Sequence, residues 1–503
     1  MTTLIDNTQT DNKRPRKKVA EGIEQSRAQA TSPSTPQSLY AKRVKLYPKL
    51  AHGLFRNIKW VALFVLLGIY YITPWIRWDR GPDQPSQAVL VDFENARFYF
   101  FFIEIWPQEV YYITGLLILA ALGLFLATSL FGRVWCGYAC PQTIWTDLFI
   151  HIERFFEGDR NARMKLDKAP WSAKKLYKKT AKHIVWVVIA AATGGAWILY
   201  FHDAPTIARD FFTGHAPITS YVFLAIMTFT TYWLAGHMRE QVCTYMCPWP
   251  RIQAAMIDEE ALNVTYRYDR GEPRGPHKKG TTWDGRGDCI DCRQCVAVCP
   301  VGIDIRDGLQ LECIGCSLCI DACDEIMGKI DRPKGLIAFD TDANVQRRME
   351  GKKSRFNLIR PRTIIYTVLF AAVGSLMLYS LLTRSTLDMN VLRDRQPNYV
   401  QLSDGAIRNG YTIKVLNKAT QPRSLNLKVD TLTSPVITLA GQRSDATIQF
   451  DVPADETMDF KIYIAESDIS ALDQKTDFKI MLTDKDTGET TSSRAIFISG
   501  GPK

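Results

Sequence analysis

Five apolar runs constrain the fold of this chain more than any other feature of its sequence. They cover residues 59–78, 110–131, 184–201, 218–236 and 363–382. At about 1.5 Å of helical rise per residue, such runs reach across or close to the roughly 30 Å hydrocarbon core of a bilayer. The 22 residues of 110–131 carry no charge, which is atypical of a helix in a water-soluble protein. The third run has only 18 residues, but Trp186, Trp197 and Tyr200 near its ends resemble interface anchors, so we predict five transmembrane helices.

The composition indicates that these helices are only part of the protein. With 503 residues, 46% of them hydrophobic, the chain is long enough for several folding units and too apolar to be disordered or collagen-like. A mean hydropathy of -0.11 is too low for a protein that lies wholly within a membrane. We expect a few spans joined to polar domains.

The distribution of Lys and Arg predicts the orientation of the chain. Residues 1–59 carry 12 of them, 153–182 carry ten and 346–362 carry seven, whereas 79–108 carry two and 202–219 carry one. Positively charged loops stay in the cytoplasm. We therefore expect the N-terminus and the region between spans four and five in the cytoplasm, and the part after span five in the periplasm of a bacterium. The net charge of +10 would also suit nucleic-acid binding, but its excess lies beside the spans, which indicates a lipid bilayer and no nucleic acid as partner.

The cysteines indicate redox or metal chemistry. All 12 lie between Cys136 and Cys323 in spacings that repeat, which is a poor match to the disulfide framework of a small secreted protein. Eight of them form two C-x-x-C-x-x-C-x-x-x-C runs, the arrangement of bacterial two-cluster ferredoxins, in which the fourth cysteine of each run binds the other cluster. We assign Cys289, Cys292, Cys295 and Cys323 to one 4Fe-4S cluster, and Cys299, Cys313, Cys316 and Cys319 to the other. Structural zinc is the alternative, but zinc sites usually pair C-x-x-C units over a longer gap.

The other four cysteines form an internal repeat. Cys136 and Cys140 precede Pro141, Cys243 and Cys247 precede Pro248, and each position is offset by 107 residues. Cysteines at i and i+4 share one face of a helix, and we expect the two pairs to converge at the membrane surface as a redox site. Four thiolates could hold Cu(I), zinc or a third iron-sulfur cluster, and the spacing leaves that choice open.

After the last span the pattern changes to period two. Segments 411–416, 425–429, 446–452, 460–464, 478–482 and 495–498 alternate or run apolar between turn residues, which is typical of short strands in an all-β, immunoglobulin-like sandwich. The predicted fold is therefore multidomain, with an α-helical membrane domain of five spans, an inserted α+β two-cluster ferredoxin domain and a C-terminal all-β domain. The expected boundaries are 1–55 for a disordered basic tail, 56–260 for the four-span membrane domain, 261–345 for the ferredoxin domain, 346–385 for the fifth span and its flank, and 386–503 for the periplasmic domain.

In order and over nearly its whole length, the chain resembles a known family. The segment from Gly132 to Thr143, its partner from Cys243 to Pro248, the double ferredoxin run and the C-terminal strands are similar to the cytochrome c oxidase accessory proteins named CcoG, FixG or RdxA. The resemblance implies a bacterial inner-membrane iron-sulfur protein that reduces Cu(II) to Cu(I) for assembly of cbb-type oxidases. It also implies copper chaperones and oxidase assembly factors as partners.

Two other functions remain open at this stage. The membrane part is also similar to quinol-oxidising polyferredoxins of the NapH and NosR type, which share the C-x-x-x-C-P pairs and would make the chain a respiratory electron-transfer subunit. A copper-delivery scaffold without enzymatic activity is the other possibility. No dinucleotide-binding glycine pattern is present, so the electron donor is expected to be a cytoplasmic reductant or a quinol.

Overall fold

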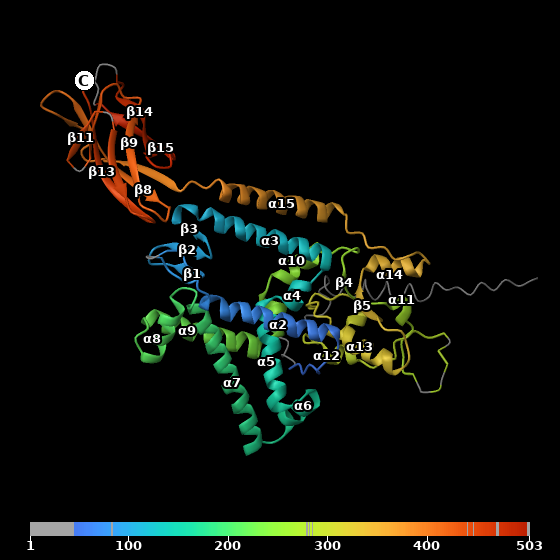
Figure 1. The fold of residues 1–503 in the computed structure, drawn as a ribbon. Helices are drawn as coiled ribbons and strands as arrows, with labels where there is room; N and C mark the ends of the chain where they lie inside the picture. Colours follow the sequence, from blue (N-terminus) through green and yellow to red (C-terminus); the bar gives the residue numbers. More distant parts are fainter. Residues whose placement is uncertain are drawn as a thin grey trace, which may run out of the picture. The chain divides into compact units, whose positions relative to one another are not determined.

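The computed structural model describes residues 45–81, 84–277, 280, 282–283, 285–439, 441–445, 447–468 and 472–499 (Figure 1). These residues fall into two compact units. The first contains the helices and the cysteine-rich region up to Met377, and the second is formed mainly by the strands from Leu378 onward. The predicted disordered tail lies outside the described residues up to position 44.

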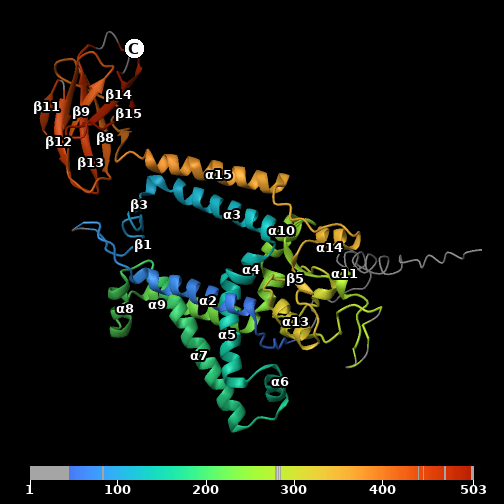
Figure 2. The ribbon, with the colours of Figure 1, turned by 45° about the vertical axis from the view of Figure 1, so that its right-hand side comes forward.

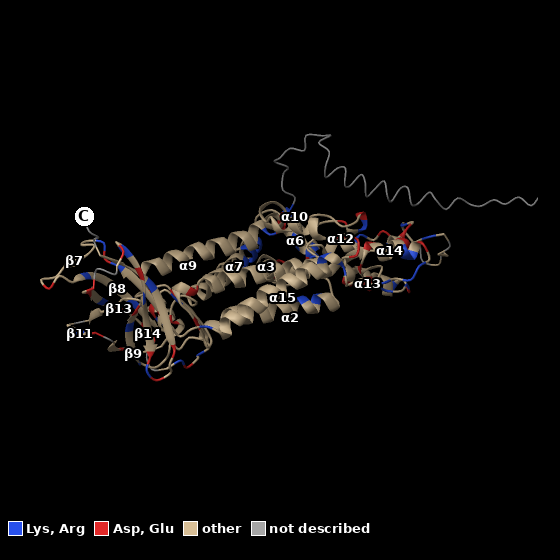
Figure 3. Ribbon diagram, turned by 90° about the horizontal axis from the view of Figure 1, so that it is seen from above, with Lys and Arg blue, Asp and Glu red and all other residues tan. Residues whose placement is uncertain are grey.

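Five helices among the described residues are long and apolar enough to cross a membrane, the same number as the spans predicted from the sequence. They are α2 (Leu54–Ile72), α3 (Tyr111–Phe131), α7 (Ala173–Ile198), α9 (Ile218–Thr231), which continues as the π-helical segment η3 (Tyr232–Met238), and α15 (Pro361–Leu382). Short 3-10 turns, η1 (Thr73–Trp75) and η2 (Pro107–Glu109), extend α2 and precede α3. Figure 3 shows that these helices carry almost no charge along most of their length.

Close packing joins α3 and α15, which run side by side in Figures 1 and 2. A Cβ added to Gly115 would come within 2.5 Å of the Met377 sulfur, and one on Gly374 would contact Leu119. Small residues allow such approaches between helices in lipid, where no hydrophobic effect drives association. The fifth span is thereby fixed to the second.

The third span begins eleven residues before its predicted start, at Ala173 rather than at 184. Its first half is rich in lysine, so an apolar window misses it. This half lies beside α5 (Pro141–Glu157), which is followed by α6 (Arg160–Lys168). Helix α8 (Ala204–Thr213) and a three-stranded sheet of β1 (Val89–Asp92), β2 (Arg97–Phe100) and β3 (Ile103–Ile105) fill the loops at the other ends of the spans.

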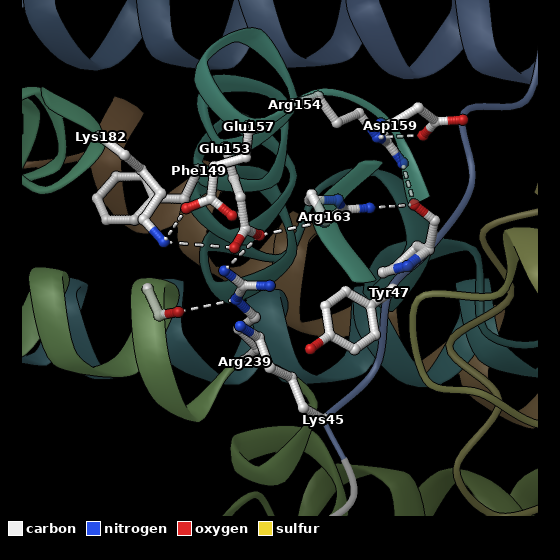
Figure 4. Close-up of polar contacts among 12 residues, drawn as sticks. Lys45, Tyr47, Phe149, Glu153, Arg154, Glu157, Asp159, Arg163, Lys182 and Arg239 are labelled. Atoms are coloured by element: carbon white, nitrogen blue, oxygen red, sulfur yellow. Dashed lines mark hydrogen bonds and ion pairs between the residues drawn. The ribbon is translucent and has the colours of Figure 1, made fainter. Parts of the chain in front are cut away.

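A buried ion network holds α5, α6, α7 and η3 together (Figure 4). The Glu153 carboxylate accepts hydrogen bonds from Arg163 at 3.2 Å, Arg239 at 2.8 Å and Lys182 at 3.5 Å. Lys182 also forms an ion pair with Glu157 at 2.8 Å. Because all five side chains are at least nine-tenths buried, each charge depends on its partners.

The same network fixes part of the segment that sequence analysis assigned to a disordered tail. Within residues 45–53, the carbonyl oxygen of Pro48 accepts from Arg163 at 2.5 Å, and the Lys49 amide donates to Ala297 at 2.8 Å. The prediction of disorder is therefore wrong for these residues. Their partners lie more than 100 positions away in the sequence, so local composition could not reveal them.

The cysteine-rich region folds around a small sheet. Strands β4 (Asn263–Tyr266) and β5 (Ile337–Asp340) pair antiparallel, and two short helices, α12 (Gln294–Val298) and α13 (Leu318–Lys329), follow the two cysteine loops. The remaining elements of this part are α10 (Trp249–Met256), α11 (Tyr268–Gly271), η5 (Ile305–Asp307) and α14 (Asp342–Met349).

The second unit is β-rich. One sheet has the order β11 (Gln442–Ser444), β10 (Pro435–Leu439), β13 (Glu456–Glu466), β8 (Ile407–Asn417) and β6 (Leu387–Arg393), with β7 (Val400–Gln401) beside β8. The other has the order β12 (Thr447–Val452), β9 (Arg423–Asp430), β14 (Lys475–Asp484) and β15 (Thr490–Ile498). Residues of both sheets share one hydrophobic core, and each of the six predicted strand segments overlaps one of these strands.

Candidate functional site

The cysteines of the two ferredoxin runs line two neighbouring cavities. The first is lined by Cys289, Cys292, Cys295 and Cys323, and the second by Cys299, Cys313, Cys316 and Cys319; Cys295 also lines the second. Each set thus combines three cysteines of one run with the fourth of the other. This grouping corresponds to the predicted ligand sets, while ligation itself stays a prediction.

The two cysteine loops each contain the same kind of backbone turn. Arg293 and Ser317, each directly after the second cysteine of its run, have φ angles of 53° and 62° in the left-handed region and begin α12 and α13. This turn brings the third cysteine of each run onto the first turn of a helix. The fourth cysteine then lies four residues further on, at the end of α12 for Cys299 and within α13 for Cys323.

The residues present fit iron-sulfur clusters better than single zinc ions. The four cysteines of each set surround a cavity, as ligands of a larger group do. Burial raises the pKa of Cys295 to about 11 and of Cys299 and Cys323 to about 12, so these thiols ionise only when they bind a positive centre.

The structure brings the other four cysteines into one region. Cys136 lies on α4 (Val134–Tyr138) and Cys243 on the π-helical segment η4 (Val242–Met246), and both contact the same hydrophobic cluster. Cys140 and Cys247 interact electrostatically with Cys136. We call these four residues the thiol site. Burial raises the pKa of both Cys136 and Cys243 to about 12, and the nearby Cys140 adds to this effect.

The two pairs differ from the predicted geometry in one respect. Cys140 and Cys247 have extended backbone and stand outside α4 and η4, so the cysteines of a pair do not share one helix face. The reason is the proline that follows each of them, which disfavours helical backbone in the preceding residue.

The thiol site lies directly against the loop of the second cavity. A Cβ added to Gly137 would meet the carbonyl oxygen of Gly315 at 2.7 Å and the Cα of Cys316 at 3.1 Å. The Tyr138 hydroxyl donates to the Cys316 carbonyl oxygen at 3.4 Å. Cys316 also belongs to the hydrophobic cluster that Cys136 and Cys243 contact. The second cavity, therefore, is the one adjacent to the thiol site.

Sequence analysis missed Arg133, which connects the segment that carries Cys136 with the loop of the second cavity. Its guanidinium donates to the carbonyl oxygens of Gln310, Leu311 and Cys313, and its side chain is buried. An arginine directly after an apolar run is usually assigned to the charged membrane interface. Nothing in the local sequence indicates that it contacts a loop 180 residues further on.

Comparison with known sequence families agrees with this organisation. Residues 113–159, with Cys136 and Cys140, match a "4Fe-4S binding domain". Residues 238–342, with the other ten cysteines, match a "4Fe-4S dicluster domain". Residues 377–500 match a family whose description is "IG-like fold at C-terminal of FixG, putative oxidoreductase".

Curated relatives resemble nearly the whole chain. The "Nitrogen fixation protein FixG" of Rhizobium meliloti is 50% identical over 456 residues, covering 85% of this chain and 87% of the relative. Protein RdxB of Cereibacter sphaeroides is 50% identical over 478 residues, covering 94% and 100%. Protein RdxA of the same organism is 51% identical over 397 residues, covering 78% and 84%.

The five spans, the 4Fe-4S domains and these matches define a membrane-bound iron-sulfur oxidoreductase. Within this class, the chain belongs to the family of FixG, RdxA and RdxB.

Proposed function

We propose that this protein reduces Cu(II) to Cu(I) at the thiol site, with electrons that pass through two 4Fe-4S clusters, for the assembly of a cbb-type cytochrome c oxidase. The observation that carries the proposal is the direct contact between Gly137, beside Cys136, and the Gly315–Cys316 loop. A site that binds a soft metal thus adjoins a site built for one-electron carriers.

The chemistry requires one electron per copper ion, and bound iron-sulfur clusters supply one-electron transfer. The four thiols supply the selectivity. Thiolate sulfur is a soft ligand and favours Cu(I) over Cu(II), so binding here makes reduction of copper more favourable. Since Cys136 and Cys243 have a pKa of about 12 without metal, copper binding must displace their protons.

One cysteine distinguishes the two cavities and supports a direction for the electrons. Cys292 of the first cavity is exposed, whereas the other seven cysteines of the two sets are buried or partly buried. A cytoplasmic reductant would therefore reach the first cluster most easily, and a quinol remains a possible donor at the membrane. Copper chaperones and oxidase assembly factors would receive the Cu(I).

The test is copper reduction by the anaerobically purified, chemically reduced protein. The double variant Cys140→Ser with Cys247→Ser should lose most Cu(II)-reductase activity and keep the iron of the ferredoxin domain. Tyr245→Phe is the matched control, because Tyr245 lies between the cysteines of one pair and is exposed. Unchanged copper reduction in the double variant would contradict the proposal.

Iron analysis of the same variants separates the alternatives. Loss of about four further iron atoms per chain would indicate a third cluster at the thiol site. The 4Fe-4S family that includes Cys136 and Cys140 favours this second candidate. Quinol oxidation independent of copper would instead indicate a respiratory subunit, and normal oxidase assembly without clusters would indicate a scaffold.

We also propose that the N-terminus and the clusters are cytoplasmic and that an immunoglobulin-like domain from 386 to 503 is periplasmic. The support is the concentration of Lys and Arg in residues 153–182 and 346–362. Reporter fusions after Lys182 and Arg355 should be active only as cytoplasmic reporters, and a fusion at Lys503 only as a periplasmic one. A cytoplasmic C-terminus would show that one predicted span does not cross.

A further inference from the structure

Two buried arginines stand beside the two cavities, one at each. Arg306 lines the first cavity and Arg133 contacts the loop of the second. The Arg306 side chain is 4% exposed, and the Arg133 residue is also 4% exposed. Water therefore screens neither charge effectively. They differ in their partners.

Arg306 is neutralised by carboxylates. It forms ion pairs with Asp304 and Asp291, and both contacts are 2.5 Å long. Its Nε also donates to Asp304 at 2.8 Å. The other arginine at this cavity, Arg293, has a side chain that is 73% exposed, so solvent weakens its field. The first cavity thus receives little net positive charge from these residues.

Arg133 is held by neutral groups instead. Its Nη1 donates to the carbonyl oxygens of Gln310 at 3.3 Å, of Leu311, and of Cys313 at 2.7 Å. Its Nη2 donates to Pro250 at 3.4 Å, and its buried Nε has no acceptor among the described residues. No carboxylate in the described part of the chain forms an ion pair with it. Its electrostatic neighbours are Cys313 and Cys136, followed by Glu312.

Asp321, a carboxylate on the helix that carries Cys319, also has positive partners. Asp321 on α13 accepts from the amides of Phe55 at 3.2 Å and Arg56 at 2.7 Å. These amides belong to the first turn of α2, the positive end of the helix dipole. Among the described residues, Arg133 is thus a buried cation that contacts the loop of this cavity and has no carboxylate as an ion-pair partner.

A positive charge in a region of low dielectric stabilises the reduced, more negative form of a redox centre and raises its potential. We propose that Arg133 positions the loop of the second cluster and raises its reduction potential above that of the first, so that an electron on the first cluster passes to the second, beside the thiol site. The step oxidises one cluster by one electron and reduces the other by one. This inference rests on the proposed binding of two clusters.

The test is a redox titration of the copper-free, cluster-loaded protein, followed by EPR. Arg133→Gln should lower the reduction potential of the second cluster. The difference between the reduction potentials of the two clusters, called the gap below, should therefore become smaller. Arg133→Lys keeps the charge without the three carbonyl contacts, so it should retain most of the gap. A gap that Arg133→Gln leaves unchanged, or that Lys narrows as much as Gln, would overturn the proposal.

A second variant changes the reduction potential of the first cluster instead of the second. Asp304→Asn leaves the charge of Arg306 less compensated, so it should raise the potential of the first cluster and also narrow the gap. This measurement holds even if Arg133→Gln loses its clusters, and an unchanged gap would again contradict the proposal. Arg360→Gln is the control, since Arg360 is buried, pairs with Asp258 and donates to the Ser129 carbonyl but lines neither cavity.

Assays of copper reduction distinguish a failure of the proposed copper reductase function from a failure of the proposed role of Arg133. If the gap responds as expected but copper is not reduced, the proposed copper reductase function is wrong and the role of Arg133 stands. If copper is reduced and the gap does not respond, the role of Arg133 is wrong and the proposed function stands.

Discussion

Gly137 lies so close to Gly315 that a Cβ on Gly137 would come within 2.7 Å of the Gly315 carbonyl oxygen. Side-chain Cβ atoms essentially never approach backbone this closely, so the contact requires glycine at position 137. Gly315 itself has φ of 68° and packs against the backbone of Arg133. The backbone beside Cys136 therefore packs directly against the backbone of the second cavity's loop.

Gly137→Ala should push these segments apart. We expect about a tenfold loss in the rate of copper reduction, equivalent to ~1.4 kcal/mol in the barrier. The added methyl group should also lower the free energy of unfolding by about 1–3 kcal/mol, as overpacking does in protein cores. The rate is measured in single turnovers of the reduced protein, and iron content shows whether the clusters remain. Gly68→Ala, where nothing lies within 4 Å, is the control and should behave like the unaltered protein.

Substitution of a proposed cysteine ligand should remove the iron of its own cavity and leave the iron of the other cavity in place. The unaltered protein should contain at least about eight iron atoms per chain and an EPR signal of two interacting reduced clusters. Cys292→Ser at the first cavity and Cys316→Ser at the second cavity should each remove about four iron atoms. Each variant should also replace the interacting signal by that of an isolated cluster. Stoichiometric zinc with little iron would refute the cluster assignment.

Glu153 should make stability depend on pH. The positive groups Arg239, Lys182 and Arg163 lower its pKa to about 2, against the effect of burial. The folded state thus binds the proton more weakly than the unfolded state, whose glutamate pKa is about 4.3. The resulting stabilisation is complete above the unfolded pKa and disappears as the pH falls through about 4 toward 2. The unfolding temperature of the detergent-solubilised protein should fall across this interval.

Glu153→Gln tests the same network at neutral pH. It leaves three buried cations with one carboxylate fewer, which should cost about 3–5 kcal/mol of unfolding free energy. The acid-dependent decrease should become smaller, because the group that titrates is absent. Glu325→Gln is the control, since its ion pair with Lys329 is exposed and should contribute less than about 1 kcal/mol. Equal unfolding temperatures of the two variants at pH 7 would contradict the role of Glu153.

The features predictable from sequence are those with a local periodicity. The uncharged stretch of α3 and the alternation in β8 and β13 require only their own residues to be recognised, and each is present in the structure. The two sets of cysteines around the cavities follow from a spacing that fixes a particular loop, because Arg293 and Ser317 adopt the same turn. Short edge strands such as β11 were missed, since three residues carry no period.

Contacts between distant segments could not be predicted in this way. The sequence indicated that the two thiol pairs lie at equivalent helix ends, but not that Gly137 contacts Gly315. The burial of Lys182 is equally hidden, because a lysine-rich stretch predicts an exposed surface unless Glu153 and Glu157 are known to face it. These interactions depend on three-dimensional proximity of residues that are far apart in the chain.

Asp321 should couple the first span to both cavities. Its carboxylate accepts from the amides of Phe55 and Arg56 and so caps α2, whose own N-cap residue, Gly53, has no side chain to do so. Asp321 lies on α13 between Cys319 of the second cavity and Cys323 of the first. Asp321→Ala removes two hydrogen bonds and a favourable helix-dipole interaction, which should cost about 1–2 kcal/mol.

Both sets of iron should then be lost faster to a chelator, because α13 is less firmly held against α2. Asp321→Asn can still accept one of the bonds and should give an intermediate rate. The control is Asp203→Ala, which removes the N-cap of α8, where Asp203 accepts from the Thr206 amide at 3.3 Å. That variant loses a cap of the same kind at a helix that lines neither cavity, so it should release iron at the normal rate. If Asp321→Ala keeps its iron as well as Asp203→Ala does, the cap stabilises α2 alone and the span is not coupled to the clusters.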